Sequence, residues 1–181
     1  MDIEQLIEAV IAREGGYSDH PADRGGKTRW GITDKVARLH GYDGPISALP
    51  RTRAVQIYRS DYWEAPKLPD IDALSTKIAE KLFDCGVNMG PRTAIRFLQR
   101  ALNALNRQEQ DYADLTKDGR IGPATLKALS SFLTRRGRVG EQILLRAIDA
   151  LQATHYIQLS EQRPANEAFL YGWLSNRIGT I

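Results

Sequence analysis

Residues 14–33 read EGGYSDHPADRGGKTRWGIT and carry the most distinctive pattern in the chain. This stretch packs five glycines into 17 residues and shows no helical spacing of apolar side chains. Glycine allows a backbone to turn sharply and to pass close to a ligand, so this stretch is expected to be a loop. We expect a short hairpin around Gly25 and Gly26, and residues 17–33 are the one segment in which strands are predicted.

Apolar residues at helical spacing predict an amphipathic helix over residues 2–14, directly before this loop. Gly15 and Gly16 end the helix because glycine adopts the left-handed C-cap conformation without strain. Beyond the loop, the same spacing predicts a mainly α chain. In the first half, we expect a helix that ends at His40, one that begins at Pro50 and one from Asp72 to about Phe83. In the second half, we expect helices that begin near Pro91, after Gly122–Pro123 and after Gly140, and a last short helix that includes Phe169 and Trp173.

The length of 181 residues, with 42% hydrophobic and 26% charged residues, suits one domain or two small ones. The polar stretch Arg107–Asp118 has few apolar residues and is expected to be a surface loop. No flexible linker interrupts the chain, and its weakest seam lies near Gly86–Pro91. We therefore expect two halves, residues 1–88 and 89–181, packed as one body.

The composition excludes several classes of function. The single Cys85 rules out an internal disulfide and a zinc site built from several cysteines. The three histidines form no i, i+4 pair, so neither a metal nor another cofactor is expected. No apolar run approaches the roughly 18–20 residues of a membrane span, which argues against stable membrane insertion. The net charge of +3 suits a polyanionic partner such as a cell wall, whereas nucleic acid binding would need a basic, aromatic-laced surface.

Glu14 is the first candidate for chemistry. It follows Ile3 by eleven positions, which returns it to within about 20° of the apolar stripe at ~100° per residue. Burial and the negative end of the helix dipole would both raise the pKa of its carboxyl group, and a general acid must hold its proton near neutral pH. A glutamate that reaches into solvent from a fraying helix end is the alternative.

Asp23 follows Glu14 by nine residues, on a loop that can fold back over the end of the helix. Glycoside hydrolysis requires two carboxylates across a sugar, one as acid and one that activates or orients water. Thr28 offers a hydroxyl group to hold that water. A glycine-rich turn without chemistry is the alternative interpretation of the same residues.

The pattern EGGYSxxPxDxGGxTxxGIT resembles the signature of glycoside hydrolase family 108, the N-acetylmuramidases of phage lysins and some bacterial wall enzymes. The spacing Glu-x8-Asp-x4-Thr is also similar to the Glu–Asp–Thr triad of phage-type lysozymes, which have one more residue before the threonine. The family resemblance implies a lysozyme-like fold with Glu14 as the catalytic acid. The triad resemblance implies that Asp23 and Thr28 are catalytic residues beside it.

Two later segments extend the resemblance. Residues 84–90, DCGVNMG, together with Tyr58 and Trp63, look like the later part of the same catalytic region. Residues 118–129, DGRIGPATLKAL, are similar to the DGxxGPxTxxAL motif of peptidoglycan-binding modules, although these residues can also serve only to build a turn. The resemblance implies a muramidase catalytic region in the first half and a helical peptidoglycan-binding-like region in the second.

Aromatic and amide side chains are the candidates for substrate binding. Tyr17, Tyr58 and Trp63 would stack on the apolar faces of sugar rings, and a role in the core is equally open for Tyr58. Trp63 precedes Glu64 and Pro66, a context typical of an exposed loop. Asn88 would hydrogen-bond an N-acetyl group or, alternatively, cap the next helix.

These resemblances imply a hydrolase that cleaves the β-1,4 bond between N-acetylmuramic acid and N-acetylglucosamine in bacterial peptidoglycan. A lytic transglycosylase that uses the same glutamate and a non-catalytic peptidoglycan-binding protein are the alternatives. We expect a monomer, made in the host cytoplasm without a signal peptide, that acts in the periplasm or cell wall as a phage endolysin with a holin-type release partner. A bacterial toxin delivered by another apparatus fits the sequence equally well.

Overall fold

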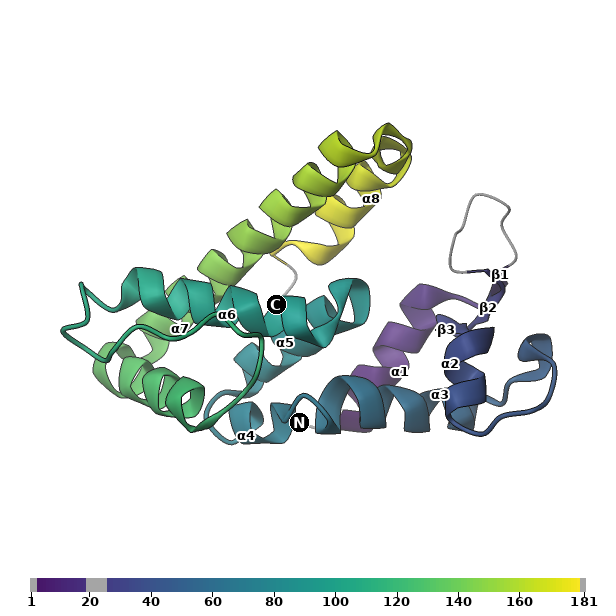
Figure 1. The fold of residues 1–181 in the computed structure, drawn as a ribbon, viewed down its shortest axis with the longest axis horizontal. Helices are drawn as coiled ribbons and strands as arrows, with labels where there is room; N and C mark the ends of the chain where they lie inside the picture. Colours follow the sequence, from purple (N-terminus) through teal and green to yellow (C-terminus); the bar gives the residue numbers. More distant parts are fainter. Residues whose placement is uncertain (1–2, 19–25, 180–181) are drawn as a thin grey trace. The chain divides into compact units, whose positions relative to one another are not determined.

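The computed structural model describes residues 3–18 and 26–179, and these form a mainly α protein (Figure 1). The described residues fall into two compact units, which divide the chain between Ala65 and Pro66. None of the helices described, the 40-residue α7 included, combines the length and the apolar character that a transmembrane span requires. The expected mainly α, lysozyme-like class is confirmed.

The first unit consists of helices around a small antiparallel sheet of strand order β1-β2-β3. Only residues in the predicted segment 17–33 form strands within the described chain, and they form a three-stranded sheet rather than a single hairpin. Trp30 and Gly31 join β2 to β3, both with positive φ (56° and 74°), as in the two-residue turns that match strand twist. The elements are α1 Ile3–Glu14, β1 Tyr17–Ser18, β2 Thr28–Arg29, β3 Ile32–Thr33, α2 Asp34–Leu39, η1 Ile46–Ala48, α3 Arg51–Tyr58 and the π-helical turn η2 Arg59–Glu64.

The apolar stripe of α1 forms part of the core, as its spacing predicts. Ile7, Val10 and Ile11 are completely buried, while the opposite face of the helix carries glutamates in ion pairs with arginines of α3 and η2. Thr33 caps the start of α2, because its hydroxyl oxygen accepts a hydrogen bond from the backbone N–H of Val36 at 3.2 Å.

The second unit is built from longer helices, and one predicted element is wrong in its bounds. Asp72 ends a short helix instead of opening a long one. The long helix begins after Ser75, whose hydroxyl caps it by accepting from the N–H of Ile78 at 3.2 Å. Pro91 starts the next helix, as predicted. The elements are α4 Leu68–Asp72, α5 Thr76–Met89, α6 Pro91–Leu105, α7 Pro123–Gln162, η3 Pro164–Asn166 and α8 Glu167–Arg177.

A break divides α7 into two limbs (Figure 1). Gly137 has φ 57° and ψ −151°, a conformation that lies outside the helical region and favours glycine. The second limb therefore starts three residues before Gly140, the glycine after which the sequence predicts a helix. Gly140 is buried, and a Cβ atom there would collide with the side chain of Arg136, so its small size serves close packing beside the break.

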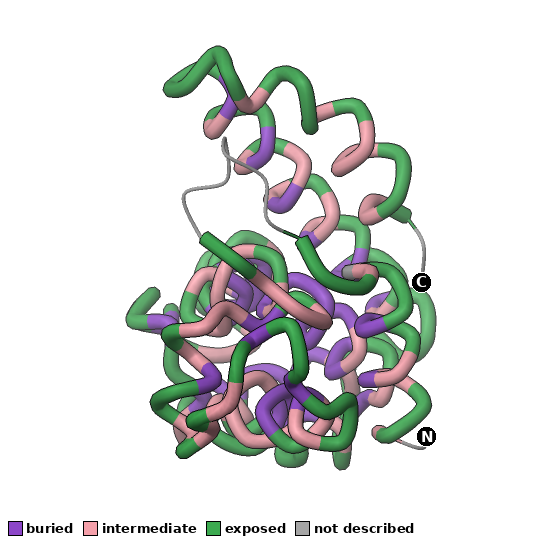
Figure 2. The backbone as a smooth tube through the Cα atoms, turned by 90° about the vertical axis from the view of Figure 1, so that its right-hand side faces the viewer, coloured by how far each residue is buried: buried purple, intermediate pink, exposed green. Residues whose placement is uncertain are grey.

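A buried polar network holds α5, α7 and α8 together. Lys81 is almost fully buried, pairs with Asp149 of α7 and donates to the carbonyl oxygen of Arg177 at 3.1 Å. The guanidinium group of Arg177 in turn donates to the Asp84 carboxylate at 3.0 Å. Helix α8 contains no buried residue (Figure 2), so these polar contacts and the stacking of Trp173 on Tyr156 at 5.2 Å attach it to the unit.

Cys85 lies beside this network and is completely buried. Burial raises the pKa of its thiol to about 12, and its Sγ donates to the side-chain oxygen of Gln152 at 3.2 Å. A nucleophilic cysteine needs an accessible thiolate. Cys85 is therefore a packing residue with a hydrogen-bonded thiol.

Candidate active site

Glu14 is the last residue of α1 and stands directly before the sheet. Gly15 follows with φ 80°, which turns the chain from the helix into β1. The backbone N–H of Trp30 donates to the carbonyl oxygen of Gly16 at 3.2 Å, so the β2–β3 turn returns to the residues just after Glu14. The Glu14 side chain and the whole of Asp23 lie outside the described residues, and the expected rise in the pKa of Glu14 stays a prediction.

Thr28 lies in the central strand of the sheet, between two other hydroxyl residues. The strand register pairs Ser18 with Thr28 and Thr28 with Thr33. Directly paired residues project from the same face of an antiparallel sheet, so the three hydroxyl groups form a row. Thr33 uses its hydroxyl to cap α2, which leaves the partly exposed Thr28 and the exposed Ser18 as neighbours along β1 and β2. Sequence reasoning missed Ser18 because the register of two strands separated by nine residues is not visible in the chain.

Aromatic and cationic side chains lie on the other face of the sheet and around the β2–β3 turn. Tyr17 pairs with Arg29 and is 47% exposed, and its stacking on a sugar ring stays a prediction. The Arg29 guanidinium lies 5.1 Å from the centre of the Trp30 ring, and that of Arg51 lies 5.6 Å from it. Trp30 donates from its ring nitrogen to the carbonyl oxygen of Leu49 at 3.1 Å. The spacing of apolar residues does not indicate Trp30. Its contacts with Arg51 and Leu49 form only when the chain folds.

Tyr58 and Trp63 are buried, whereas stacking on a sugar requires an exposed ring. Tyr58 is 2% exposed and donates from its hydroxyl to the carbonyl oxygen of Trp30 at 3.0 Å. Trp63 lies within η2 rather than in an exposed loop and is 6% exposed. A buried ring offers no open face to a sugar, so the burial favours the packing role for both, and Tyr58 supports the β2–β3 turn.

Asn88 belongs to the second unit, near the end of α5. Its side-chain amide donates to the carbonyl oxygen of Asp84 at 2.8 Å, and Gly90 rather than Asn88 is the N-cap of α6. The helix-capping role is therefore wrong. A role in substrate binding stays a prediction for this exposed residue. Across the described part of the chain, no three His, Cys, Asp or Glu side chains lie together as metal ligands would.

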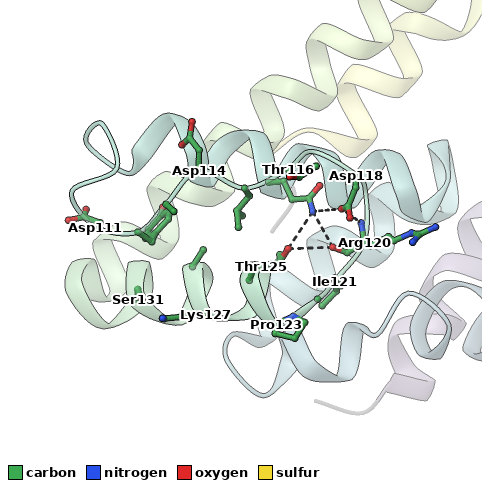
Figure 3. Close-up of a pocket in the computed structure, with 17 residues that line it drawn as sticks. Asp111, Asp114, Thr116, Asp118, Arg120, Ile121, Pro123, Thr125, Lys127 and Ser131 are labelled. Carbon is green, nitrogen blue, oxygen red and sulfur yellow. Dashed lines mark hydrogen bonds between the residues drawn. The ribbon is translucent and has the colours of Figure 1, made fainter.

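The second motif, residues 118–129, builds a tight turn before α7 (Figure 3). The Asp118 carboxylate accepts from the backbone N–H of Arg120 and from the side-chain amide of Gln99, both at 2.9 Å. Gly119 has φ 72°, and a Cβ atom there would lie 2.6 Å from the carbonyl oxygen of Arg92, so this position needs glycine. The motif thus has a structural role, whatever it binds.

Replacing Asp118 with asparagine is expected to destabilise the second unit at neutral pH and to matter less in acid. The hydrogen bond from Gln99, and then that from the Arg120 backbone, lower the pKa of Asp118 below the ordinary value of 3.8. A carboxyl group with a lowered folded-state pKa stabilises the fold above its ordinary pKa, and this contribution is lost as the pH falls through the folded-state value. Urea unfolding midpoints at pH 7, 4 and 2 test this, with Asp70→Asn, an exposed carboxylate of α4, as the control. A deficit that does not change with pH would contradict it.

The helical first unit, with an acidic residue where its first helix meets a small hydroxyl-bearing sheet, has the architecture of lysozyme-like glycosidases. Comparison with known families agrees: residues 7–90 match the model of the family described as glycosyl hydrolase 108, and residues 93–178 match the family described as a predicted peptidoglycan domain. The chain therefore joins a glycosyl hydrolase 108 domain to a peptidoglycan-binding domain, and it is a glycoside hydrolase that acts on peptidoglycan.

A solved structure resembles nearly the whole chain. The protein is similar to Brucella abortus SagA, with 26% sequence identity and a TM-score of 0.71, over 94% of this chain and 86% of that one. The similarity extends through both matched regions. No curated protein matches the chain.

Proposed function

We propose that the protein is an N-acetylmuramidase that hydrolyses the β-1,4 bond between N-acetylmuramic acid and N-acetylglucosamine, with Glu14 as the general acid. The observation that carries this proposal is the placement of Glu14. It ends α1 within the glycosyl hydrolase 108 region and is joined by two glycines to the strand that pairs with Thr28. A helix end joined so closely to a sheet fixes the backbone from which a catalytic side chain projects.

The chemistry follows from two carboxyl groups. Glu14 protonates the glycosidic oxygen as the bond breaks, while Asp23 stabilises the positive charge that develops on the sugar or orients the attacking water. Thr28 and its neighbour Ser18 supply hydroxyl groups on one face of the sheet to hold that water. A separation of ~6.5–9.5 Å between the carboxyl groups would give inversion, and ~5–5.5 Å a covalent, retaining route.

Analysis of the reaction products tests this function directly. Purified peptidoglycan is digested, and the soluble fragments are reduced with borohydride and examined by mass spectrometry. Fragments that end in reducible N-acetylmuramic acid are the expected result. Anhydro ends would identify a lytic transglycosylase, and reducible N-acetylglucosamine ends would place the cleavage at the other glycosidic bond. Sedimentation with the wall without any cleavage would leave a binding protein.

Replacing Asp23 with asparagine is expected to lower the hydrolysis rate by several orders of magnitude, because the positive charge of the transition state loses its counter-charge. The change conserves size and removes one negative charge. Release of soluble fragments from labelled peptidoglycan measures it, with Asp43→Asn, an exposed aspartate of the same unit, as the control. A loss smaller than tenfold would remove Asp23 from the catalytic residues.

We also propose that the protein is a monomeric phage endolysin that reaches the wall through a holin-type release partner. The peptidoglycan-binding domain supports the wall as its place of action. Expression in a bacterial host with and without a membrane-permeabilising protein tests the proposal. Lysis that requires the second protein is the expected result, and lysis without it would contradict the need for a partner. Sedimentation equilibrium measures the oligomeric state.

A further inference from the structure

The second unit contains a pocket of about 710 Å³ between the loop of residues 106–122 and the first turns of α7 (Figure 3). Loops of this length without helix or strand are uncommon in compact domains, and they usually have a function. The pocket uses part of the turn motif at 118–129 but extends well beyond it along the loop. Nothing in the mechanism above uses this pocket.

Three amide side chains along α6 and at its end hold the loop in place. Gln99 and Asn103 of α6 are four residues apart on one face of the helix, and Asn106, the C-cap residue, follows three residues later. Gln99 accepts from the N–H of Gly119 at 2.9 Å, and Asn103 both donates to the carbonyl and accepts from the N–H of Leu115 at 2.8 Å. Gln99 is buried, and buried amides are costly unless their hydrogen bonds are formed. These hydrogen bonds therefore hold the loop in its open conformation.

The far end of the loop is fixed in the same way. Asn106 donates to the Asp114 carboxylate at 2.6 Å, and Tyr112 donates from its hydroxyl to the carbonyl oxygen of Leu102 at 2.8 Å. Asp111 pairs with Arg107 and, at 3.1 Å, with Arg135 of α7. A loop anchored at both ends and in its middle holds a preformed pocket, which lowers the entropic cost of binding a ligand.

The lining of the pocket indicates the chemistry of its ligand. The buried side chains of Leu115, Ile121 and Ala128 are apolar, whereas Lys127, Arg120, Asp114 and Asp118 bring both signs of charge and Thr116 and Ser131 bring hydroxyl groups. Among the lining residues Tyr112 alone is aromatic, and its hydroxyl is already bound. Sugar-binding sites usually stack several sugar rings on aromatic faces, whereas this lining offers a single aromatic ring. A short peptide with methyl side chains, carboxylates and an ammonium group fits it better.

We propose that this pocket binds the peptide stem of peptidoglycan rather than its glycan strand. The proposal rests on the proposed function in one respect, that peptidoglycan is the substrate. Peptide stems consist of alanine, an acidic residue and a diamino acid, which matches an apolar surface bordered by carboxylates and cations. Binding of the stem by the second unit would keep the protein on cross-linked wall while the first unit cleaves glycan.

Binding measurements with two separate probes test the proposal on the full-length protein. The probes are the free stem tetrapeptide, which lacks sugar, and a peptide-free glycan tetrasaccharide of the wall. In ¹H–¹⁵N NMR spectra, the tetrapeptide is expected to shift the amide signals of residues 112–128, and the tetrasaccharide is expected to leave them unchanged. The proposal is overturned if only the tetrasaccharide shifts these signals. It is also overturned if neither probe shifts them.

Two variants with the same new side chain locate the binding site. Ala124 is exposed and lines the pocket, so Ala124→Trp should fill it and weaken tetrapeptide binding at least about tenfold. Ala150 is an exposed alanine of the second limb of α7 that does not line the pocket, and Ala150→Trp should bind as the wild type does. Equal affinities of both variants for the tetrapeptide would overturn the proposal.

If Ala124→Trp does not fold, Lys127→Glu replaces it, and the expected loss of affinity comes from reversing a charge in the lining of the pocket. The binding readout needs no turnover. Absence of cleavage with intact tetrapeptide binding would therefore refute the enzymatic proposal alone, and cleavage without tetrapeptide binding would refute the pocket alone.

Discussion

Replacing Glu14 with glutamine is expected to abolish nearly all peptidoglycan hydrolysis, with a rate loss of at least about a hundredfold, because general acid catalysis contributes 10²–10⁴-fold. Glutamine has almost the same size as glutamate but carries no transferable proton. Glutamine is also a good helix former, so the exchange is compatible with the last turn of α1 and with the glycine of positive φ that follows it. Release of soluble fragments from labelled wall measures the rate, and circular dichroism shows whether the fold is intact.

Glu8 provides a matched control on the same helix. It pairs with Arg51 at the surface, with its side chain 42% exposed, and exposed ion pairs contribute at most about 1 kcal/mol. Glu8→Gln is therefore expected to change the stability of the fold only slightly. We expect its hydrolysis rate to stay within about twofold of that of the wild type. A Glu14→Gln protein that folds and keeps more than a tenth of the activity would contradict the assignment of the general acid. Unfolding of this variant, with Glu8→Gln folded, would indicate a structural role.

Replacing Asp149 with leucine is expected to destabilise the second unit by about 3–5 kcal/mol, because it leaves a buried ammonium group without its counter-charge. The Lys81 side chain is 2% exposed, and the carbonyl oxygen of Arg177 would be its remaining partner among the contacts described above. Water reaches a group this buried only if α5, α7 or α8 moves. Urea unfolding followed by circular dichroism measures the loss, and fluorescence of Trp173, which stacks on Tyr156, reports on α8.

A double replacement separates the charge effect from a packing effect. Lys81→Met combined with Asp149→Leu removes both charges and keeps apolar volume, and exchanges of this kind are often neutral or stabilising. We expect the double variant to recover most of the stability that Asp149→Leu loses. A single variant that costs less than about 1 kcal/mol, or a double variant that is no more stable than the single one, would show that the ion pair does not hold these helices.

The helices were predictable where local spacing and glycine agree. Residues 3–14 place an apolar stripe before Gly15, and Pro91 can begin a helix but not continue one, so both boundaries are visible in the chain. The start of α5 was missed because Ser75 and Asp72 are both good capping residues, and only the packing of Leu68 and Ile71 in the core makes a separate helix before Ser75. The break in α7 was misplaced for a similar reason, since two glycines three residues apart are equivalent until the packing around Gly140 is known.

Some residues of the candidate active site were likewise predictable from the sequence, and others were not. Glu14, Thr28 and the glycines lie in one continuous segment, so the sequence alone indicates them. Ser18 and Trp30 acquire their neighbours through strand register and through contacts with Leu49 and other distant residues.

The mainly helical class, the segment that holds the strands and the acidic residue at the end of the first helix all follow from the order of the residues along the chain. Helices and turns depend on residues three or four apart and on the backbone freedom of glycine and proline, all of which can be read along the chain. Three features depend on how the chain packs: the hydroxyl groups that share a sheet face, the pairing of Lys81 with partners 68 and 96 residues away, and the hold of the α6 amides on the loop around the pocket. These pairings join groups that are distant in sequence, so they form only when the whole unit has packed.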